Sequence, residues 1–376
     1  MPVRVIVVGA GIVGSCVALR LAQGAAEVTL LDASTPGAGT TGTSFAWIDA
    51  SHPALDGYLE LNIAGVRAWH DVAADFGDPD WLTITGTLTW ESDPDRAAAL
   101  EARIEELAAR GFGARALDAG DVAELEPDLR LDGLAGKVAY YPEESFLFTR
   151  PALADLLARA VDAGVSLRTG ATVTGFATSG EAVTGVQLST GETLGADAVV
   201  TCVGRWTEDV LRLAGVELPM TAPEPAPSPA VGLLVLTTPT VARLRRVVVV
   251  DGLMIRPDGA GRLLLHGDEQ DARMRADTPM TPAPAEALEL VELARGRLRG
   301  SETAALESAR IGIRALPADH LPAVGWTRDG LYAVVSHSGV TIAPALGELV
   351  REELLEGEQV DALERFRPAR FERAMT

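Results

Sequence analysis

The start of the chain shows two apolar runs separated by a glycine-rich turn and a helical stretch. The run at 3–8 has the length of a buried strand, and helical periodicity continues from the turn to residue 22. The second run, at 27–31, ends directly before the acid Asp32. The pattern therefore predicts a strand, a helix and a second strand in that order.

The rest of the chain alternates between amphipathic stretches and short apolar runs, which predict helices and strands respectively. Helices are expected at 57–75, 95–110, 118–125, 152–163, 283–299 and 341–355. Strands are expected at 86–91, 138–141, 165–168, 172–177, 183–189, 192–194, 198–203, 233–236, 247–250, 253–255, 262–266 and 331–335. Five prolines between residues 218 and 229 predict a stiff, extended connector.

The composition is that of an ordinary globular protein with room for two lobes. The 376 residues exceed what one hydrophobic core usually holds, and 47% of them are hydrophobic and 23% charged. A formal net charge of −21 argues against nucleic acid or an anionic membrane surface as a partner. No apolar run could cross a bilayer, and no secretion signal is recognisable at the N-terminus. We therefore expect a cytoplasmic protein with no membrane-spanning segment.

The cysteines and histidines give no sign of a metal site. The two cysteines, Cys16 and Cys202, cannot form a disulfide framework and lack metal-ligand spacing. Both fall in apolar surroundings, which favours small buried residues over reactive ones. No cluster of histidines with acids is visible either, so no metal is expected.

Three glycines in the first turn have the spacing Gly-x-Gly-x-x-Gly. Gly9 permits the tight turn, Gly11 lets the backbone approach a diphosphate, and Gly14 lets the helix pack closely on the strand. The helix N-terminus adds free N–H groups and partial positive charge, and Asp32 is placed to accept hydrogen bonds from an adenosine ribose. Together with the order of elements, these residues predict a dinucleotide site without identifying the dinucleotide.

Five separated segments of the chain resemble the FAD-dependent D-amino-acid oxidase and glycine/sarcosine oxidase superfamily. The segments are the glycine fingerprint, the loop Gly39–Trp47, the stretch from Phe148 to Val173, the segment Thr201–Trp206, and the stretch from Ile311 to Thr341. They span nearly the whole chain. The resemblance implies FAD, and not NAD, as the cofactor.

The resemblance also implies a fold and a division into domains. The expected fold is α/β, with a Rossmann-like FAD-binding domain that is discontinuous in sequence and a second, α+β domain with an antiparallel sheet for the substrate. We expect residues 1–85, 146–216 and 305–376 in the FAD-binding domain, and residues 86–145 and 217–304 in the substrate domain.

The motifs and the resemblance together imply a set of FAD contacts from distant parts of the chain. These are Gly9, Ala10, Gly11, Ile12, Val13, Gly14, Asp32, Ala33, Thr40, Thr41, Ser44, Phe45, Ala46, Trp47, Val173, Cys202, Val203, Gly204, Trp206, Ser338, Gly339, Val340 and Thr341. The last four begin a helix whose unpaired N–H groups form a positive end. Such an end would stabilise reduced flavin, which is anionic at its pyrimidine edge.

Oxidation of an amine by flavin needs few catalytic side chains, because alignment of the C–H bond does most of the work. A substrate carboxylate must be held, and an arginine fork does this well. Arg314 matches the arginine that binds the substrate carboxylate in glycine-oxidase-like relatives. Arg256 is an alternative, and Tyr140 or Tyr141 could offer a hydroxyl group. His337 precedes the flavin-side helix and is expected to contact the flavin, with a role as a base as the alternative.

Two departures from sarcosine-oxidase relatives bear on the chemistry. Those relatives attach flavin through a cysteine near the fifth segment, where this chain has none, so FAD should bind non-covalently. They also carry an oxygen-activating lysine on the strand that corresponds to 262–266, and this strand has no lysine. Oxygen and another electron acceptor therefore both remain open.

The leading hypothesis is an FAD-dependent oxidoreductase that oxidises a small amino acid or N-alkyl amino acid to its imine by hydride transfer to flavin N5. The substrate would be a small amine that bears a carboxylate. An FAD-dependent 2-hydroxy-acid dehydrogenase is an alternative, because the same arginine would serve it. A third hypothesis is a non-catalytic flavin-binding module.

Overall fold

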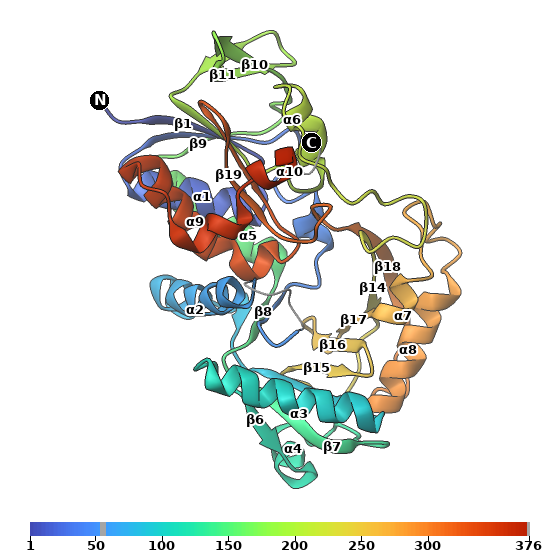
Figure 1. Cartoon of the computed structure of the whole chain (residues 1–376). Coiled ribbons are helices and arrows are strands. Elements are labelled where there is room, and N and C mark those ends of the chain that lie inside the picture. Colours follow the sequence, from blue (N-terminus) through green and yellow to red (C-terminus); the bar gives the residue numbers. More distant parts are fainter. Residues whose placement is uncertain (53–57, 374–376) are drawn as a thin grey trace.

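The computed structural model describes residues 1–52 and 58–373, and two large sheets organise it (Figure 1). One sheet has six strands and the other has eight. Both sheets are built from segments far apart in the sequence. Figure 1 shows them as two parts joined side by side, with the early and late segments of the chain together in one part.

The six-stranded sheet has the strand order β19-β20-β13-β1-β2-β9. Its strands are β1 (Arg4–Val8), β2 (Glu27–Leu31), β9 (Ser166–Arg168), β13 (Ala198–Thr201), β19 (Ala323–Arg328) and β20 (Leu331–Val335). All neighbours pair in parallel except β19, which is antiparallel to β20. Strand β1 lies between β2 and β13, so the order reverses there. Ligands of open α/β sheets bind at such a point, beyond the carboxyl ends of the strands.

Helices cover this sheet and bury its apolar strands. They are α1 (Ile12–Gln23), α2 (Tyr58–Phe76), α5 (Thr149–Asp162) and α9 (Gly339–Glu356). Helix α1 packs against both α5 and α9, and α2 packs on the outer side of α9 (Figure 1). Helix α2 approaches closely because Gly65 faces the backbone of α9, where a Cβ would lie 2.5 Å from the Thr341 oxygen.

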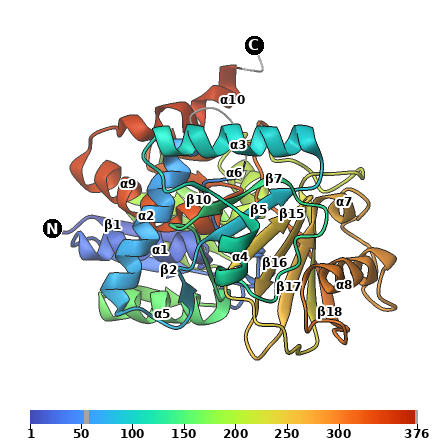
Figure 2. The same cartoon turned by 90° about the horizontal axis from the view of Figure 1, so that it is seen from below.

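The eight-stranded sheet has the order β18-β14-β17-β16-β15-β5-β7-β6. Its strands are β5 (Thr87–Glu91), β6 (Arg115–Leu117), β7 (Ala135–Tyr141), β14 (Val231–Thr237), β15 (Val247–Val250), β16 (Leu253–Pro257), β17 (Leu263–Gly267) and β18 (Leu306–Ile313). All neighbours are antiparallel except β15 and β5. Helix α8 (Ala285–Arg297) packs on β14, β16, β17 and β18, while α3 (Pro94–Ala109) and α4 (Ala119–Leu125) pack on the β5–β7 end (Figure 2).

Alternation along these strands gives the eight-stranded sheet two different faces. Leu233, Leu265 and Ile255 point into the core shared with α8. Their neighbours Met254 and His266 point to the opposite face, which is turned toward the glycine-rich loops. The functional side chains of this sheet therefore stand on one face.

The remaining elements are shorter. They are β3 (Trp47–Ile48), β4 (Leu82–Thr83), β8 (Ser145–Leu147), β10 (Val173–Ser179), β11 (Ala182–Leu188), β12 (Thr193–Gly195), η1 (Thr40–Thr43), η2 (Gly204–Trp206), η3 (Asp361–Phe366), α6 (Thr207–Arg212), α7 (Asp268–Asp271) and α10 (Ala369–Arg373). Strands β3, β8 and β4 form one small sheet, and β10, β11 and β12 form another.

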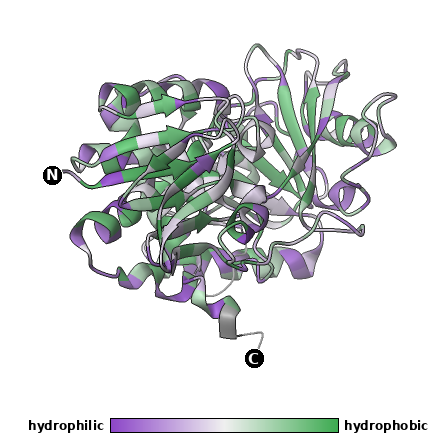
Figure 3. Cartoon of the chain, turned by 90° about the horizontal axis from the view of Figure 1, so that it is seen from above, coloured by the Kyte–Doolittle hydropathy of each residue, from purple (hydrophilic) through white to green (hydrophobic). Residues whose placement is uncertain are grey.

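Most predicted elements are present. The strands at 27–31, 247–250 and 331–335 have the predicted bounds, and the predicted helices are found within three residues of their expected ends. Residue 57, the first of one predicted helix, lies outside the described residues. Figure 3 shows why the apolar runs were informative, since the strands of both sheets are strongly hydrophobic. Strands β18 and β19 and the short strands β3, β4, β6 and β8 were not predicted, because polar residues interrupt them or they are too short for a pattern.

One predicted domain boundary needs correction. The sequence placed 305–376 in the FAD-binding domain. Strand β18 instead pairs with β14 along its length, from Val231 opposite Ile313 to Thr237 opposite Leu306. Residues 306–313 therefore belong to the eight-stranded sheet, because hydrogen bonding and not position in the chain decides sheet membership. The rest of the division remains a prediction.

Among the helices of the described residues, none is both long and apolar enough to span a membrane.

Candidate cofactor and active site

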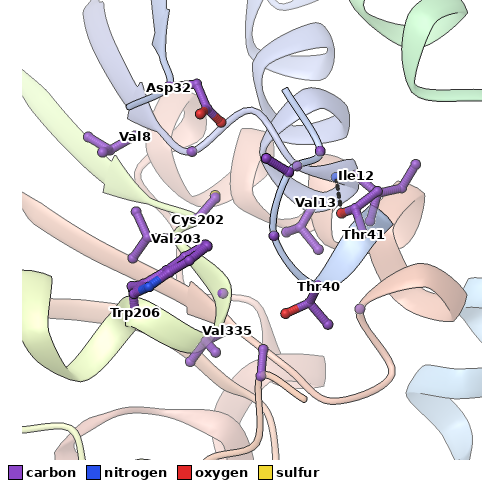
Figure 4. Close-up of a pocket in the computed structure, with 18 of the residues that line it drawn as sticks. Val8, Ile12, Val13, Asp32, Thr40, Thr41, Cys202, Val203, Trp206 and Val335 are labelled. Atoms are coloured by element: carbon purple, nitrogen blue, oxygen red, sulfur yellow. Dashed lines mark hydrogen bonds between the residues drawn. The ribbon is translucent and has the colours of Figure 1, made fainter. Parts of the chain in front are cut away.

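A cavity of about 400 Å³ opens beyond the carboxyl ends of β1 and β13. Figure 4 shows side chains from several distant segments around it, with Asp32 at one end of the view and Thr40 and Val335 toward the other. The cavity therefore lies at the point where the strand order reverses, as expected for this type of sheet.

Close packing leaves no room for a side chain at two glycines of the fingerprint. Gly9 has a φ of +104°, and a Cβ there would lie 2.5 Å from the Cys202 carbonyl oxygen. A Cβ on Gly14 would lie 1.9 Å from the Gly9 carbonyl oxygen. Both positions exclude a side chain, so the turn can bring backbone N–H groups to the edge of the cavity.

The N-terminus of α1 is directed at this turn. Its N-cap residue is Gly11, which has no side chain to cap it, and its first turn contains no acid. The hydroxyl of Thr41 accepts a hydrogen bond from the Ile12 N–H at 3.1 Å (Figure 4). The carboxylate of Asp32 accepts from the Ala10 N–H at 2.9 Å and from the Ser34 N–H at 2.8 Å. The remaining N–H groups and the helix dipole favour a diphosphate.

Trp206 lines the cavity and is 45% exposed. Gly39 makes room for the indole, because a Cβ at that position would lie 2.8 Å from the ring. The Arg205 guanidinium lies 4.3 Å from the centre of the same ring. This arrangement offers a flat apolar surface with a positive charge beside it.

The far end of the cavity is formed by the turn between β20 and α9. Ser336, His337, Gly339 and Val340 line it. The Tyr58 hydroxyl is 2.7 Å from the Ser336 hydroxyl and accepts the Ser338 N–H at 3.3 Å. Helix α9 thus points a second positive end toward the cavity, without a side-chain cap.

The His337 side chain is exposed and lines the partly open cavity. Desolvation of the imidazole by nearby protein, with smaller contributions from the Arg314 charge and from neighbouring histidines, lowers the pKa of His337 because it disfavours the charged form. The imidazole is therefore uncharged at neutral pH. A nitrogen of such low basicity is a poor proton acceptor, so the geometry favours contact with a cofactor over a role as a base.

Arg314 directly follows β18, and most N–H donors of its guanidinium form hydrogen bonds with acceptors of the protein. Nη1 donates to the carbonyl oxygens of Pro229 and Val231 at 2.8 and 2.7 Å. Nη2 donates to the Asp271 carboxylate at 2.5 Å and lies 3.3 Å from Nε2 of His266. Arg314 is outside the cavity lining, but its charge is near enough to help lower the pKa of His337, which lines the cavity. The sequence predicted an arginine for the substrate, but gave no sign of this ion pair.

The alternative candidates are placed differently. Arg256 is only 3% exposed, and its Nε donates to the Phe45 oxygen at 2.6 Å. Burial lowers its pKa to about 10, although Asp258 opposes the shift. Tyr141 is fully buried, and the Tyr140 hydroxyl donates to the Thr85 oxygen at 3.3 Å. These contacts favour structural roles for all three candidates.

Many of the predicted FAD contacts meet at the one cavity. They are Gly9, Gly11, Ile12, Val13, Asp32, Ala33, Thr40, Thr41, Ser44, Val173, Cys202, Val203, Gly204, Trp206, Gly339 and Val340, together with the predicted catalytic residue His337. Outside its lining are Ala10, Gly14, Phe45, Ala46, Trp47, Ser338, Thr341 and Arg314. Ala10, Gly14 and Ser338 shape the turns beside it, while the Thr341 hydroxyl donates to the Trp47 oxygen at 3.4 Å.

Sequence reasoning missed other lining residues. They are Val8, Ser34, Gly37, Ala38, Gly39, Ala171, Thr172, Asp209, Val210, Ala315, Val334, Val335 and Ser336. Most of them adjoin a predicted contact, so a wider window around each motif would have found them. Asp209 and Val210 on α6 had no signal in the sequence.

A buried acid pair supports the segment after β3. One Glu144 oxygen accepts the N–H groups of Ala50 and Ser51 at 3.0 and 2.8 Å, and the other accepts the indole N–H of Trp47 at 3.1 Å. Burial and the charge of Asp49 raise the pKa of Glu144 to about 7. Burial likewise raises the pKa of Asp49. The pair therefore favours a protonated state more than either acid would alone.

We expect the stability of the protein to fall as the pH rises from about 4.5 to 7, because the folded state binds the Glu144 proton more tightly than the unfolded state does. The Glu144→Gln variant should show a smaller decrease in melting temperature between about pH 5.5 and pH 8, by an amount equivalent to about 1–3 kcal/mol. Melting curves at the two pH values test this. Equal decreases in both proteins would contradict it, and Glu143→Gln, which changes the adjacent glutamate, is the matched control.

The cavity fits a dinucleotide on structural grounds. Side chains are excluded where backbone must approach a diphosphate, an acid stands at one end, and a helix N-terminus lies at each end. In the part of the chain that the structure describes, no group of three His, Cys, Asp or Glu side chains is arranged to hold a metal ion. Both cysteines are buried, and burial raises the pKa of Cys16 to about 12.

Comparison with known proteins gives a match along most of the chain. The family model described as FAD dependent oxidoreductase matches residues 4–353. Glycine oxidase of Pseudomonas putida is 28% identical to the chain over 380 aligned residues, which cover 96% of each protein.

Two solved structures share the fold. L-proline dehydrogenase from P. horikoshii superposes with a TM-score of 0.86 at 21% identity, covering 99% of this chain and 98% of that one. Glycine oxidase from Geobacillus kaustophilus superposes with a TM-score of 0.81 at 21% identity, covering 98% and 99%. The predicted fold class is confirmed by these likenesses.

Proposed function

The chain belongs to the FAD dependent oxidoreductase family, and we propose that it oxidises a small amino acid or N-alkyl amino acid to the corresponding imine. The prediction of FAD as the cofactor is confirmed by this membership. The observation that carries the proposal is the cavity that runs from the Gly9 turn to His337, with the Arg314 charge close enough to act on His337. Relatives named as a glycine oxidase and a D-amino acid dehydrogenase support the substrate class.

The residues of the cavity would hold FAD by its two ends, and without a covalent bond. The turn at Gly9 and Gly11 and the N-terminus of α1 suit the diphosphate, with Asp32 at the adenosine ribose. The turn at Gly339 and the N-terminus of α9 suit the anionic edge of a reduced ring. Trp206 and the loop at Thr40 would enclose the part between these ends.

FAD held by these residues would supply a two-electron acceptor for the Cα hydride of the amino acid, whose nitrogen would form the imine and lose a proton to solvent. Arg314 would orient the substrate through its carboxylate. His337, uncharged at neutral pH, can contact substrate or cofactor without adding charge. Water then hydrolyses the released imine.

The electron acceptor is either oxygen or another oxidant. Strand β17 contains no lysine, and Lys137, the one lysine of the chain, pairs with Asp118 at 2.5 Å in the eight-stranded sheet. This supports slow reaction with oxygen, although relatives are named both as oxidases and as dehydrogenases. Stopped-flow mixing of the reduced protein with oxygen distinguishes an oxidase from a dehydrogenase.

We also propose a cytoplasmic location, in keeping with the acidic net charge of the chain.

We expect the purified protein to be yellow, to release FAD on acid precipitation, and to lose its flavin absorption under anaerobic conditions when a small amino acid or N-alkyl amino acid is added. Absorption spectra recorded with panels of amino acids and 2-hydroxy acids test this. Bleaching by 2-hydroxy acids alone would assign the alternative reaction. Bleaching by neither panel would contradict an oxidoreductase role for these substrates and favour a flavin-binding module.

A further inference from the structure

Asp271 holds Arg314 in a way that bears on substrate selectivity. The acid is the last residue of α7, and its side chain is 8% exposed. One carboxylate oxygen accepts the Leu233 N–H at 2.7 Å, and the other accepts Nη2 of Arg314 at 2.5 Å. The second oxygen also lies 3.4 Å from Nε2 of His266. A buried carboxylate therefore neutralises Arg314, whose charge acts on the cavity residue His337.

The state of His266 follows from its partners. Its Nδ1 is 3.0 Å from the Leu233 carbonyl oxygen, which can only accept, so Nδ1 carries a proton. Nε2 lies 3.3 Å from the Arg314 Nη2 group, which can only donate, so Nε2 accepts this hydrogen bond. Both Nη2 hydrogens of Arg314 are thus directed at Asp271 and His266.

This leaves Arg314 with little to offer a ligand. A guanidinium has five N–H donors, and a carboxylate is held at two points by Nε–H together with one Nη2–H, or by both terminal groups. The Pro229 and Val231 oxygens accept from Nη1, and Nη2 is engaged as described. Among residues 1–52 and 58–373, no acceptor is found for Nε–H, so it alone is available.

We propose that Asp271 sets the charge selectivity of the substrate site, because it neutralises Arg314 and restricts it to a one-point contact with a substrate carboxylate. The proposal rests on the proposed function, since it assigns the substrate carboxylate to Arg314. It predicts a site with only a modest preference for carboxylates over uncharged isosteres. The substrate class then includes amino acids whose carboxyl group is an amide as well as free amino acids.

An Asp271→Asn substitution is well suited to test this. The asparagine oxygen can keep the Leu233 N–H, which places the amide nitrogen where the second carboxylate oxygen was. That nitrogen can donate to Nε2 of His266, so the Arg314 Nη2 group is released. Arg314 remains held by the Pro229 and Val231 oxygens. In the variant, Nε–H and one Nη2–H of Arg314 are therefore both available to a substrate carboxylate. The site also gains one net positive charge, while the Pro229 and Val231 oxygens still hold Nη1.

The experiment titrates the oxidised, FAD-loaded protein with acetate and benzoate, and with the uncharged isosteres acetamide and benzamide. Binding is followed by the change in flavin absorption, which requires no turnover. We expect Asp271→Asn to bind the two carboxylates about 5- to 10-fold more tightly and the two amides with unchanged affinity. The gain should disappear in the double variant Asp271→Asn with Arg314→Ala.

Asp268→Asn is the matched control, because it removes the same charge from an exposed position of the same helix. An equal gain in that variant, or no gain in Asp271→Asn, overturns the proposal. If Asp271→Asn does not fold, the proposal is tested by the relative affinities of the wild-type protein for acetate and acetamide. A preference for acetate over acetamide below about tenfold supports the proposal, and one above about a hundredfold overturns it.

Failure of the proposed function can be told apart from failure of the proposal on Asp271. If no amino acid bleaches the flavin, the proposed oxidation is contradicted, but the carboxylate titrations still test the role of Asp271. A flavin spectrum that responds to carboxylates equally in the wild type and in Arg314→Ala overturns the present proposal only.

Discussion

Gly14→Ala is expected to lower the FAD content of the purified protein by more than about tenfold, with a lower melting temperature. The new Cβ would lie 1.9 Å from the Gly9 carbonyl oxygen and 3.1 Å from the Cys202 side chain. The backbone cannot yield there without moving the turn that carries the diphosphate N–H groups. The ratio of flavin to protein absorption, measured on freshly purified protein, tests this.

Gly296→Ala is the matched control for that substitution. Both glycines lie inside helices, but a Cβ at position 296 meets nothing within 4 Å. Alanine there should leave FAD content unchanged and raise stability slightly, by about 0.4–1 kcal/mol. A full complement of FAD in Gly14→Ala would show that the close contact does not control the cofactor site.

Arg314→Ala should raise the KM for the amino acid substrate by about 10- to 100-fold while changing FAD content little, because a charge-assisted hydrogen bond contributes about 1.5–3 kcal/mol. The variant also leaves the buried Asp271 carboxylate without its cation, which repels an anionic substrate and lowers stability. Steady-state kinetics and melting curves measure the two effects separately.

The double variant Arg314→Ala with Asp271→Asn separates stability from binding, since it should restore much of the melting temperature but leave KM high. Arg310→Ala is the control, because Arg310 lies on β18, four residues before Arg314, and is exposed. Unchanged KM in Arg314→Ala would remove this residue from the substrate site.

Local patterns predicted the turn, helix and strands that line one end of the cavity. The spacing of Gly9, Gly11 and Gly14, the acid at 32 and the two strands around them follow from backbone rules that act over a few residues. Apolar periodicity likewise located most helices and strands. These features could be read because each depends on near neighbours in the chain.

The contacts of the predicted catalytic residues could not be predicted from local sequence patterns, because their partners are far away in the chain. Asp271 is 43 positions from Arg314, and Glu144 is 94 from the Ala50 N–H that it accepts. Strand β18 was not predicted, because its alternating residues include Glu307, Ser308 and Arg310 and resemble an exposed segment. Without β18 and its register on β14, nothing places Arg314 next to the Pro229 and Val231 oxygens.

The sequence by itself determined that a glycine-rich turn follows the first strand, that apolar runs form most of the strands, and that its motifs resemble an FAD-dependent family. The tertiary structure decided which polar groups meet. It lowered the pKa of His337 by desolvation, paired Arg314 with Asp271, and buried Glu144 beneath the segment after β3. The reason is physical: turns and periodicity depend on residues close in the chain, whereas the charge of a site depends on sheet register and on how deeply each group is buried.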